Sequence, residues 1–305
     1  MATTLSLRPE VSHFLAGKFR EADRLISDVT SRLGVRPQDA PPGTTGPNLL
    51  VLCHMMKALI TAWLGDFDAA ERACQQMSRL AQANDRPYDT VAAEYGRGSV
   101  ELLRGHLDEA EHGFDHALRM ARESEVRLFL PLIMCGLGNV YTQRGEGARG
   151  RDILLDAKRE AEALEHATSI VVVSAYLGAA YAQLGEIQHG LSLVRACLAG
   201  ARQKGYGGIE LLAASYEASI LASEGTAARS EAIDAFKRAI DIAERLESGP
   251  ILAAAKGGLG NLLADAGRTA EAQDELAQAL ALFDRSKMTV QGERVRATLS
   301  KFSGV

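Results

Sequence analysis

Apolar residues recur along the chain at helical spacing, and one pattern of them returns about every 40 residues. The stretch Gly136–Glu146 (GLGNVYTQRGE) reappears with small changes as Tyr176–Glu186 (YLGAAYAQLGE) and Gly258–Arg268 (GLGNLLADAGR). Apolar positions three and four residues apart predict amphipathic helices, and a glycine that follows such a run predicts a helix end. Each copy therefore reads as the end of one helix, a tight turn and the start of a second helix.

The turn glycines give the register of the whole chain. They are spaced 40 residues apart from Gly65 to Gly225, with intervals of 48 before and 42 after this run: Gly17, Gly65, Gly105, Gly145, Gly185, Gly225 and Gly267. Glycine tolerates the left-handed backbone that often ends a helix. A fixed interval of this length indicates stacked helical hairpins, because one hairpin cannot bury its apolar face alone.

Two further positions keep the same distance from each turn. Seven residues before it stands a small residue: Ala58, Gly98, Gly138, Gly178, Ala218 and Gly260. Nine residues after it stands an apolar residue: Ile26, Cys74, Phe114, Leu154, Val194 and Leu276. Small residues let two antiparallel helices approach closely, and larger ones fill the space beside them. After Gly225 the pattern slips by two residues, which predicts a two-residue insertion in that turn.

The register predicts a single all-α domain over residues 1–305, made of seven hairpins. The expected hairpins cover about 8–34, 48–85, 88–125, 129–165, 168–204, 208–247 and 250–286. Residues 35–47 are rich in Pro and Gly and read as a linker, and about 289–303 reads as a capping helix. Since each repeat contacts only its neighbours, we expect an elongated, curved solenoid.

This arrangement resembles the tetratricopeptide repeat family over almost the whole chain. The matching residues are Gly138 and Tyr141 in the first helix, Gly145 at the turn, and Leu154 and Ala157 in the second helix. The period of 40 is longer than the family's usual length of about 34, and the family's early Trp is missing. The long period looks like the C-terminal repeat regions of bacterial signalling ATPases, nucleotide cyclases and transcription activators. The resemblance implies a right-handed superhelix with a concave groove.

The composition limits the classes of partner that we expect for this protein. The net charge is −5, with a pI near 5.9, which argues against direct nucleic-acid binding. Four widely spaced cysteines and no recognisable secretory signal lead us to expect a reducing, cytoplasmic location. Ala167–Gly185 holds no charged residue, but its hydroxyl, amide and glycine residues favour a core helix over a membrane span. We therefore expect no membrane partner.

No catalytic or cofactor motif emerges from the spacing. His112 and His116 stand four residues apart and could share a metal, yet they fall opposite Phe114 and Ala117, where a solvated helix face is expected. The Gly-Leu-Gly pairs lie inside helices rather than after a strand, as a dinucleotide loop requires. We expect no metal and no cofactor, and a protein that is not an enzyme.

The resemblance places a binding groove on the first helix of each hairpin. The positions that it assigns to the groove include Tyr95, Asn139, Gln143, Tyr176, Gln183, Tyr216 and Asn261. These residues are uncharged and amphipathic, unlike the basic carboxylate clamp of chaperone-tail receptors in the family. They suit a peptide, an apolar helix or a small ligand. The alternative is that the tyrosines pack between repeats.

Two functions follow from the sequence. The first is a non-catalytic scaffold that binds a peptide or a segment of another protein in its concave groove. The second is the sensor region of a bacterial signalling ATPase, nucleotide cyclase or transcription activator, responding to a small ligand or partner. The sequence leaves open the identity of the partner, the oligomeric state, and use of the groove or the convex face.

Overall fold

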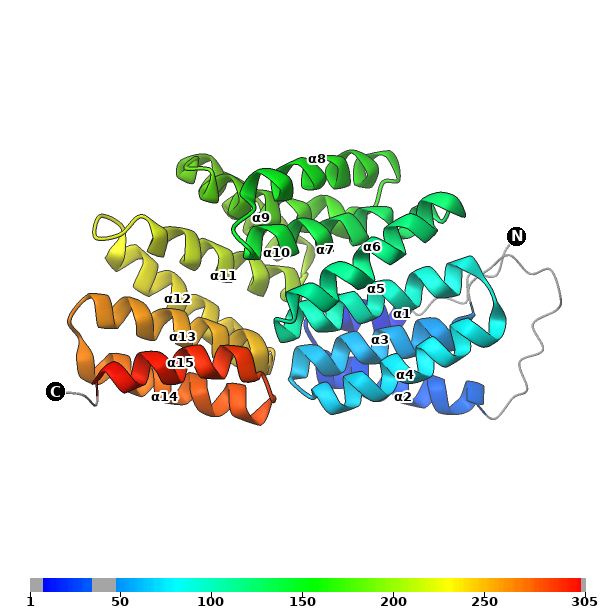
Figure 1. The fold of residues 1–305 in the computed structure, drawn as a ribbon, viewed down its shortest axis with the longest axis horizontal. Coiled ribbons are helices and arrows are strands. Elements are labelled where there is room, and N and C mark those ends of the chain that lie inside the picture. The colour runs from blue at the N-terminus through cyan, green and yellow to red at the C-terminus, as the bar shows by residue number, and fades with distance from the viewer. Residues whose placement is uncertain (1–7, 35–47, 303–305) are drawn as a thin grey trace.

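The computed structural model describes residues 8–34 and 48–302, and all of their regular structure is helical (Figure 1). The expected linker at 35–47 and the last residue of the expected cap lie outside the described residues. Successive helices pack in pairs, which confirms the all-α repeat fold. The bounds are α1 Arg8–Leu15, α2 Phe19–Gly34, α3 Leu49–Leu64, α4 Phe67–Asn84, α5 Pro87–Arg104, α6 Leu107–Glu123, α7 Leu130–Gln143, α8 Gly147–Ala163, α9 Ala167–Gln183, α10 Ile187–Lys204, α11 Gly207–Ser223, α12 Arg229–Arg245, α13 Gly249–Asp265, α14 Thr269–Arg285 and α15 Thr289–Phe302, with a short 3₁₀ helix, η1, at Arg127–Phe129.

Close helix approach occurs at the predicted small position in the four hairpins that carry glycine there. A Cβ atom built on Gly138 would lie 2.3 Å from Cγ of Leu154, the apolar residue that follows the same turn. Equivalent clashes link the other glycines of this position to their partners: Gly98 with Phe114, Gly178 with Val194 and Gly260 with Leu276. Carbon atoms in contact normally stay about 3.5–4.0 Å apart, so these positions admit only glycine at the present helix spacing.

The turns follow the predicted register. Gly65 and Gly145 have positive φ of 85° and 84°, the left-handed region that glycine enters without steric cost. Helices α8 and α10 each begin two residues after their turn glycine, whereas α12 begins at Arg229, four residues after Gly225. The two-residue insertion predicted for that turn is therefore confirmed.

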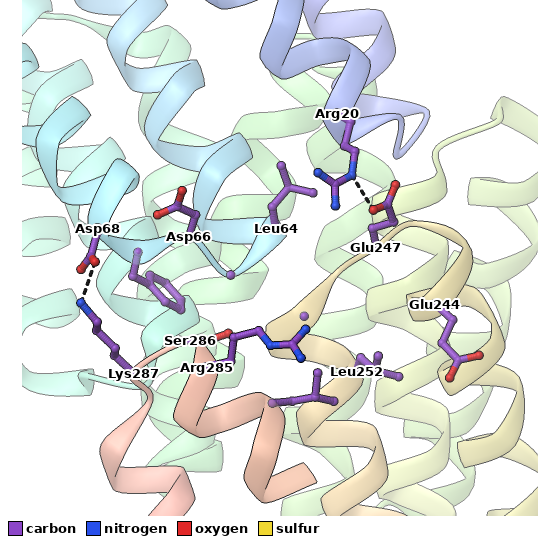
Figure 2. A pocket seen from close by; sticks show the side chains of 14 residues that line it. Arg20, Leu64, Asp66, Asp68, Glu244, Glu247, Leu252, Arg285, Ser286 and Lys287 are labelled. Carbon is purple, nitrogen blue, oxygen red and sulfur yellow. Dashed lines mark hydrogen bonds and ion pairs between the residues drawn. The ribbon is translucent and has the colours of Figure 1, made fainter. Parts of the chain in front are cut away.

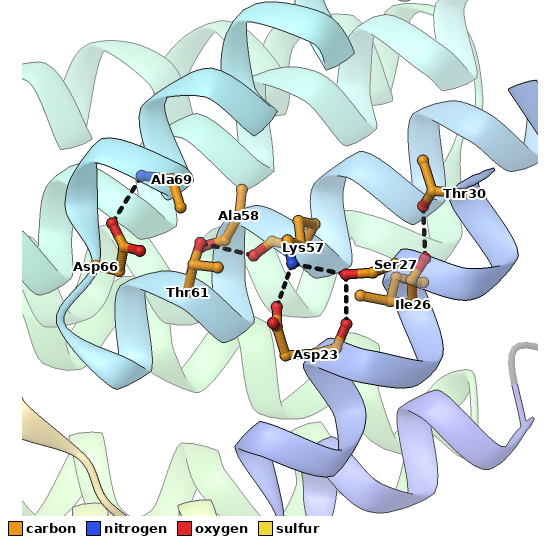
Figure 3. A network of polar contacts seen from close by, with 9 residues as sticks. All are labelled: Asp23, Ile26, Ser27, Thr30, Lys57, Ala58, Thr61, Asp66 and Ala69. Carbon is orange, nitrogen blue, oxygen red and sulfur yellow. Dashed lines mark hydrogen bonds and ion pairs between the residues drawn. The ribbon is translucent and has the colours of Figure 1, made fainter.

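The first hairpin is tied to the second by a polar network between α2 and α3 (Figure 3). The Nζ atom of Lys57 donates to Oδ1 of Asp23 at 2.5 Å and to Oγ of Ser27 at 2.8 Å. Both side chains of the Lys57–Asp23 pair are less than one-third exposed, so water competes only partly with this contact. Helix α2 is thereby held against α3.

The stack of hairpins curves so far that its N-terminal helices lie beside its C-terminal helices, and Figure 1 shows it as an arch with α1–α5 beside α11–α15. Residues at three N-terminal helix ends contact two C-terminal loops and the start of α15, along a line that we call the seam. Arg20 pairs with Glu247, Lys287 Nζ donates to Asp68 at 2.6 Å, and the Gln291 amide donates to the Arg104 carbonyl at 2.8 Å. The expectation that repeats contact only their neighbours is therefore wrong at the seam.

Helix α9 is the uncharged segment that imitates a membrane span. It contacts α7, α8, α10 and α11, so other helices of the stack surround it on several sides. Among the residues that the structure describes, no helix has both the length and the apolar character needed to cross a bilayer. The four cysteines are buried and unpaired, and burial raises the pKa of Cys53 to about 11 and that of Cys135 to about 12.

Candidate functional site on the inner helix layer

The first helices of successive hairpins form one continuous layer. Helix α5 contacts α3 and α7, and α9 contacts α7 and α11. Most of the sequence-predicted groove residues lie on this layer, from α5 to α11. We call the set Tyr95, Asn139, Gln143, Tyr176, Gln183 and Tyr216 the central strip.

The centre of the strip is a hydrogen bond between hairpins that are not adjacent. The hydroxyl of Tyr216 on α11 donates to Oδ1 of Asn139 on α7 at 2.6 Å, passing over α9. The amide of Gln143 donates to the same oxygen at 3.3 Å. Asn139 is only 5% exposed. It therefore lies beneath the surface, rather than on the open groove where the sequence placed it, because the curvature brings α7 within reach of α11.

Tyr176 and Tyr216 form an aromatic pair beside this hydrogen bond. Their ring centroids are 5.8 Å apart and the rings meet edge to face at 86°, a favourable geometry for two aromatic side chains. Burial raises the pKa of both phenols well above the usual value, and for Tyr216 the bond with Asn139 partly offsets this effect. Both rings are half-buried, so each keeps some accessible surface.

Tyr95 is built into the packing between repeats. Its ring centroid lies 5.5 Å from that of Phe129 and 6.2 Å from that of Phe114. Burial raises its pKa to about 12. Sequence reasoning did not single out Phe129, which belongs to η1, an element with no equivalent in the 40-residue pattern. For Tyr95 the packing alternative is the better description.

The outer edge of the strip is formed by amides. Gln143 and Gln183 are both exposed, and the Gln183 side chain donates to the main-chain carbonyl of Thr142 in the preceding hairpin. Asn261 is exposed on α13, and no hydrogen bond or ring contact joins it to the strip within the described ranges. The structure thus connects five of the seven predicted residues, whereas Tyr95 packs against Phe114 and Phe129 and Asn261 lies apart.

The strip combines two kinds of recognition chemistry. Half-buried phenol rings offer an apolar floor, and each exposed glutamine offers an amide donor and a carbonyl acceptor at the rim. A peptide backbone presents the complementary pair, N–H and C=O.

His112, by contrast, is exposed on α6, and His116 lies 3.6 Å from Oε1 of Glu94. In the described part of the chain, no group of three or more His, Cys, Asp or Glu side chains is placed to hold a metal.

The comparisons with solved structures concern the fold. NprR in complex with its cognate peptide NprX superposes with a TM-score of 0.71 at 11% identity, over 98% of this chain and 86% of that one. A Rap protein complexed with competence and sporulation factor gives 0.68 at 15% identity, over 92% and 76%. Cut9 from the APC/C Cut9–Hcn1 hetero-tetramer gives 0.59 at 14% identity, over 97% and 49%.

No family model matches the sequence, and no curated protein matches it. At these low identities the likeness establishes the architecture. The chain has the tetratricopeptide-repeat-like fold, in agreement with the resemblance seen in its sequence.

Proposed function

We propose that this protein is a non-catalytic binding scaffold that holds a peptide, or a peptide-like segment of a partner protein, along the central strip. The observation that carries the proposal is the combination of the half-buried Tyr176–Tyr216 pair with the exposed amides of Gln143 and Gln183. Two neighbours in fold, NprR and the Rap protein, were solved with a bound peptide or factor, which supports the same class of ligand here.

The roles within the strip differ by depth. Tyr176 and Tyr216 would contact apolar side chains of the peptide, since large aromatic residues dominate such contacts. Gln143 and Gln183 would hydrogen-bond its backbone in place of water. Asn139 has a supporting role, because its carbonyl oxygen already accepts from Tyr216 and Gln143. It fixes the position of the Tyr216 ring.

The proposal is tested by selecting binders from a displayed library of random peptides and measuring their affinity by calorimetry. The variant Gln143→Ala/Gln183→Ala removes two exposed side-chain amides together with their hydrogen bonds to Asn139 and to the Thr142 carbonyl. Because both glutamines are exposed, the fold should survive. We expect it to weaken the selected peptides at least tenfold, which corresponds to about 1.4 kcal/mol.

The matched control is Gln75→Ala/Gln278→Ala, which removes two exposed glutamine amides from the second helices α4 and α14. Peptide binding should be unchanged in this control. A library that yields no binder would contradict the proposal. Binders that are lost in the control and kept in the strip variant would contradict it as well and would point to the second helices.

A further inference from the structure

A cavity of about 520 Å³ lies at the seam, apart from the central strip (Figure 2). Its walls come from opposite ends of the chain. The turn between α3 and α4 supplies Leu64–Asp68, and the ends of α12 and α14 supply Glu244 and Arg285. Ligand pockets commonly have volumes of roughly 300–1,000 Å³, so this open cavity has room for a small molecule.

Two ion pairs frame the cavity, and within each pair the positive and negative charges balance. Arg20 pairs with Glu247 on one side, and Lys287 pairs with Asp68 on the other. The Lys287 ammonium holds the pKa of the Asp68 carboxyl below its ordinary value, chiefly through their hydrogen bond. These four groups therefore leave no net charge for a ligand to match.

Three charged side chains of the lining remain after this pairing. The guanidinium of Arg285 extends across the cavity toward Leu252, as Figure 2 shows. Neither Arg285 nor Glu244 has a side-chain hydrogen bond or ion pair with any residue that the structure describes. Asp66 caps α4 through a 2.9 Å bond from the Ala69 N–H to its Oδ1 and has no cationic partner there.

The rest of the lining is apolar or small. Leu64, Phe67, Leu252 and Leu282 supply hydrocarbon surface, while Gly65 and Gly249 add no side chain. The cavity therefore presents one cation and two carboxylates around an apolar wall. Its complement is a molecule with an anionic group for Arg285, a cationic group for the carboxylates of Asp66 and Glu244, and apolar side chains between them.

We propose that the seam cavity binds a short peptide with free termini and apolar side chains. Arg285 would hold the terminal carboxylate in a two-pronged hydrogen bond, a geometry that guanidinium and carboxylate share. Asp66 or Glu244 would accept from the terminal ammonium, and the side chains would cover Leu252 and Leu282. Such a ligand bridges both ends of the superhelix, so its binding stabilises the closed seam.

Calorimetry and thermal melting with the dipeptide leucyl-leucine test this proposal on the full chain. We expect saturable binding and a melting temperature that rises with ligand concentration. N-acetyl-leucyl-leucine amide, which lacks both terminal charges, should bind at least tenfold more weakly. Arg285→Gln should lose at least tenfold in affinity, while Arg268→Gln, which removes an arginine paired only with nearby Glu271, should bind as the parent does.

The outcomes separate this site from the central strip. Leucyl-leucine binding that persists in Gln143→Ala/Gln183→Ala but falls in Arg285→Gln supports the seam site, whatever the fate of the strip proposal. No binding of leucyl-leucine overturns it. Equal binding of the capped dipeptide, or unchanged affinity in Arg285→Gln, overturns it as well.

Discussion

Replacing Gly138 by alanine is a direct test of the close approach between α7 and α8. The added Cβ would lie 2.3, 2.6 and 3.0 Å from Cγ and the two Cδ atoms of Leu154, all well inside carbon contact distance. Leu154 is 0% exposed, so its side chain cannot move away from the new methyl group without displacing the residues packed around it. The helices must separate or the leucine must leave its rotamer.

The expected magnitude is a balance of two effects. Alanine in place of glycine within a helix stabilises by about 0.5–1 kcal/mol. Overpacking a well-filled core costs about 1–3 kcal/mol, and contact at 2.3 Å places this case at the upper end. We expect Gly138→Ala to lower the free energy of unfolding by about 2 kcal/mol.

Gly200→Ala is the matched control, because it offers the same helix propensity without the clash. Its Cβ would meet only Val171, at an ordinary 3.8 Å. Urea titrations followed by circular dichroism should show Gly200→Ala stabilised by about 0.5–1 kcal/mol. The second substitution Leu154→Ala should remove the clash, giving a coupling energy of at least about 1 kcal/mol in a double-mutant cycle. If Gly138→Ala and Gly200→Ala were stabilised by the same amount, the packing argument would be refuted.

Two other measurements probe the strip and the seam. Burial raises the pKa of Tyr95 to about 12 and that of Tyr216 further. The contribution of these neutral phenols to stability is complete below the unfolded pKa of about 10 and is lost as pH rises through the folded pKa values. Urea midpoints should therefore fall as pH rises above about 10, and they should fall less in Tyr216→Phe. Arg20→Gln should lower the free energy of unfolding by no more than about 1 kcal/mol, because Arg20 and Glu247 are both exposed. This effect should vanish in high salt, and a decrease that does not depend on salt would contradict a surface ion pair.

The sequence predicts best what is decided within one hairpin. The contact of Gly138 with Leu154 spans one tight turn, so a repeated pattern of small and large residues is enough to reveal it. The two-residue insertion after Gly225 could be predicted for the same reason. Both features depend on the helix period and the turn length, which are local properties of the chain.

Contacts between distant hairpins could not be predicted in this way. Tyr216 meets Asn139 across 77 residues, and Arg20 meets Glu247 across 227. Such contacts depend on the rotation between successive repeats, and a small rotation adds up over the stack. The pattern placed Asn139 and Tyr216 on the same layer of helices. It could not show that Asn139 is buried, because the depth of a residue in a concave surface depends on that accumulated curvature.

Closure at the seam also limits how the number of hairpins can change in related proteins. In an open solenoid a duplicated hairpin lengthens the stack and leaves the other interfaces intact. Here an added hairpin between α5 and α11 would move Glu247 and Lys287 one step along the superhelix, away from Arg20 and Asp68. Gly207 now packs so closely on Ala16 that an added Cβ would lie 2.5 Å from the Ala16 carbonyl oxygen, and after such an insertion it would contact a different surface. Relatives that keep the seam residues should therefore keep the number of hairpins between them, with length variation confined to the loops.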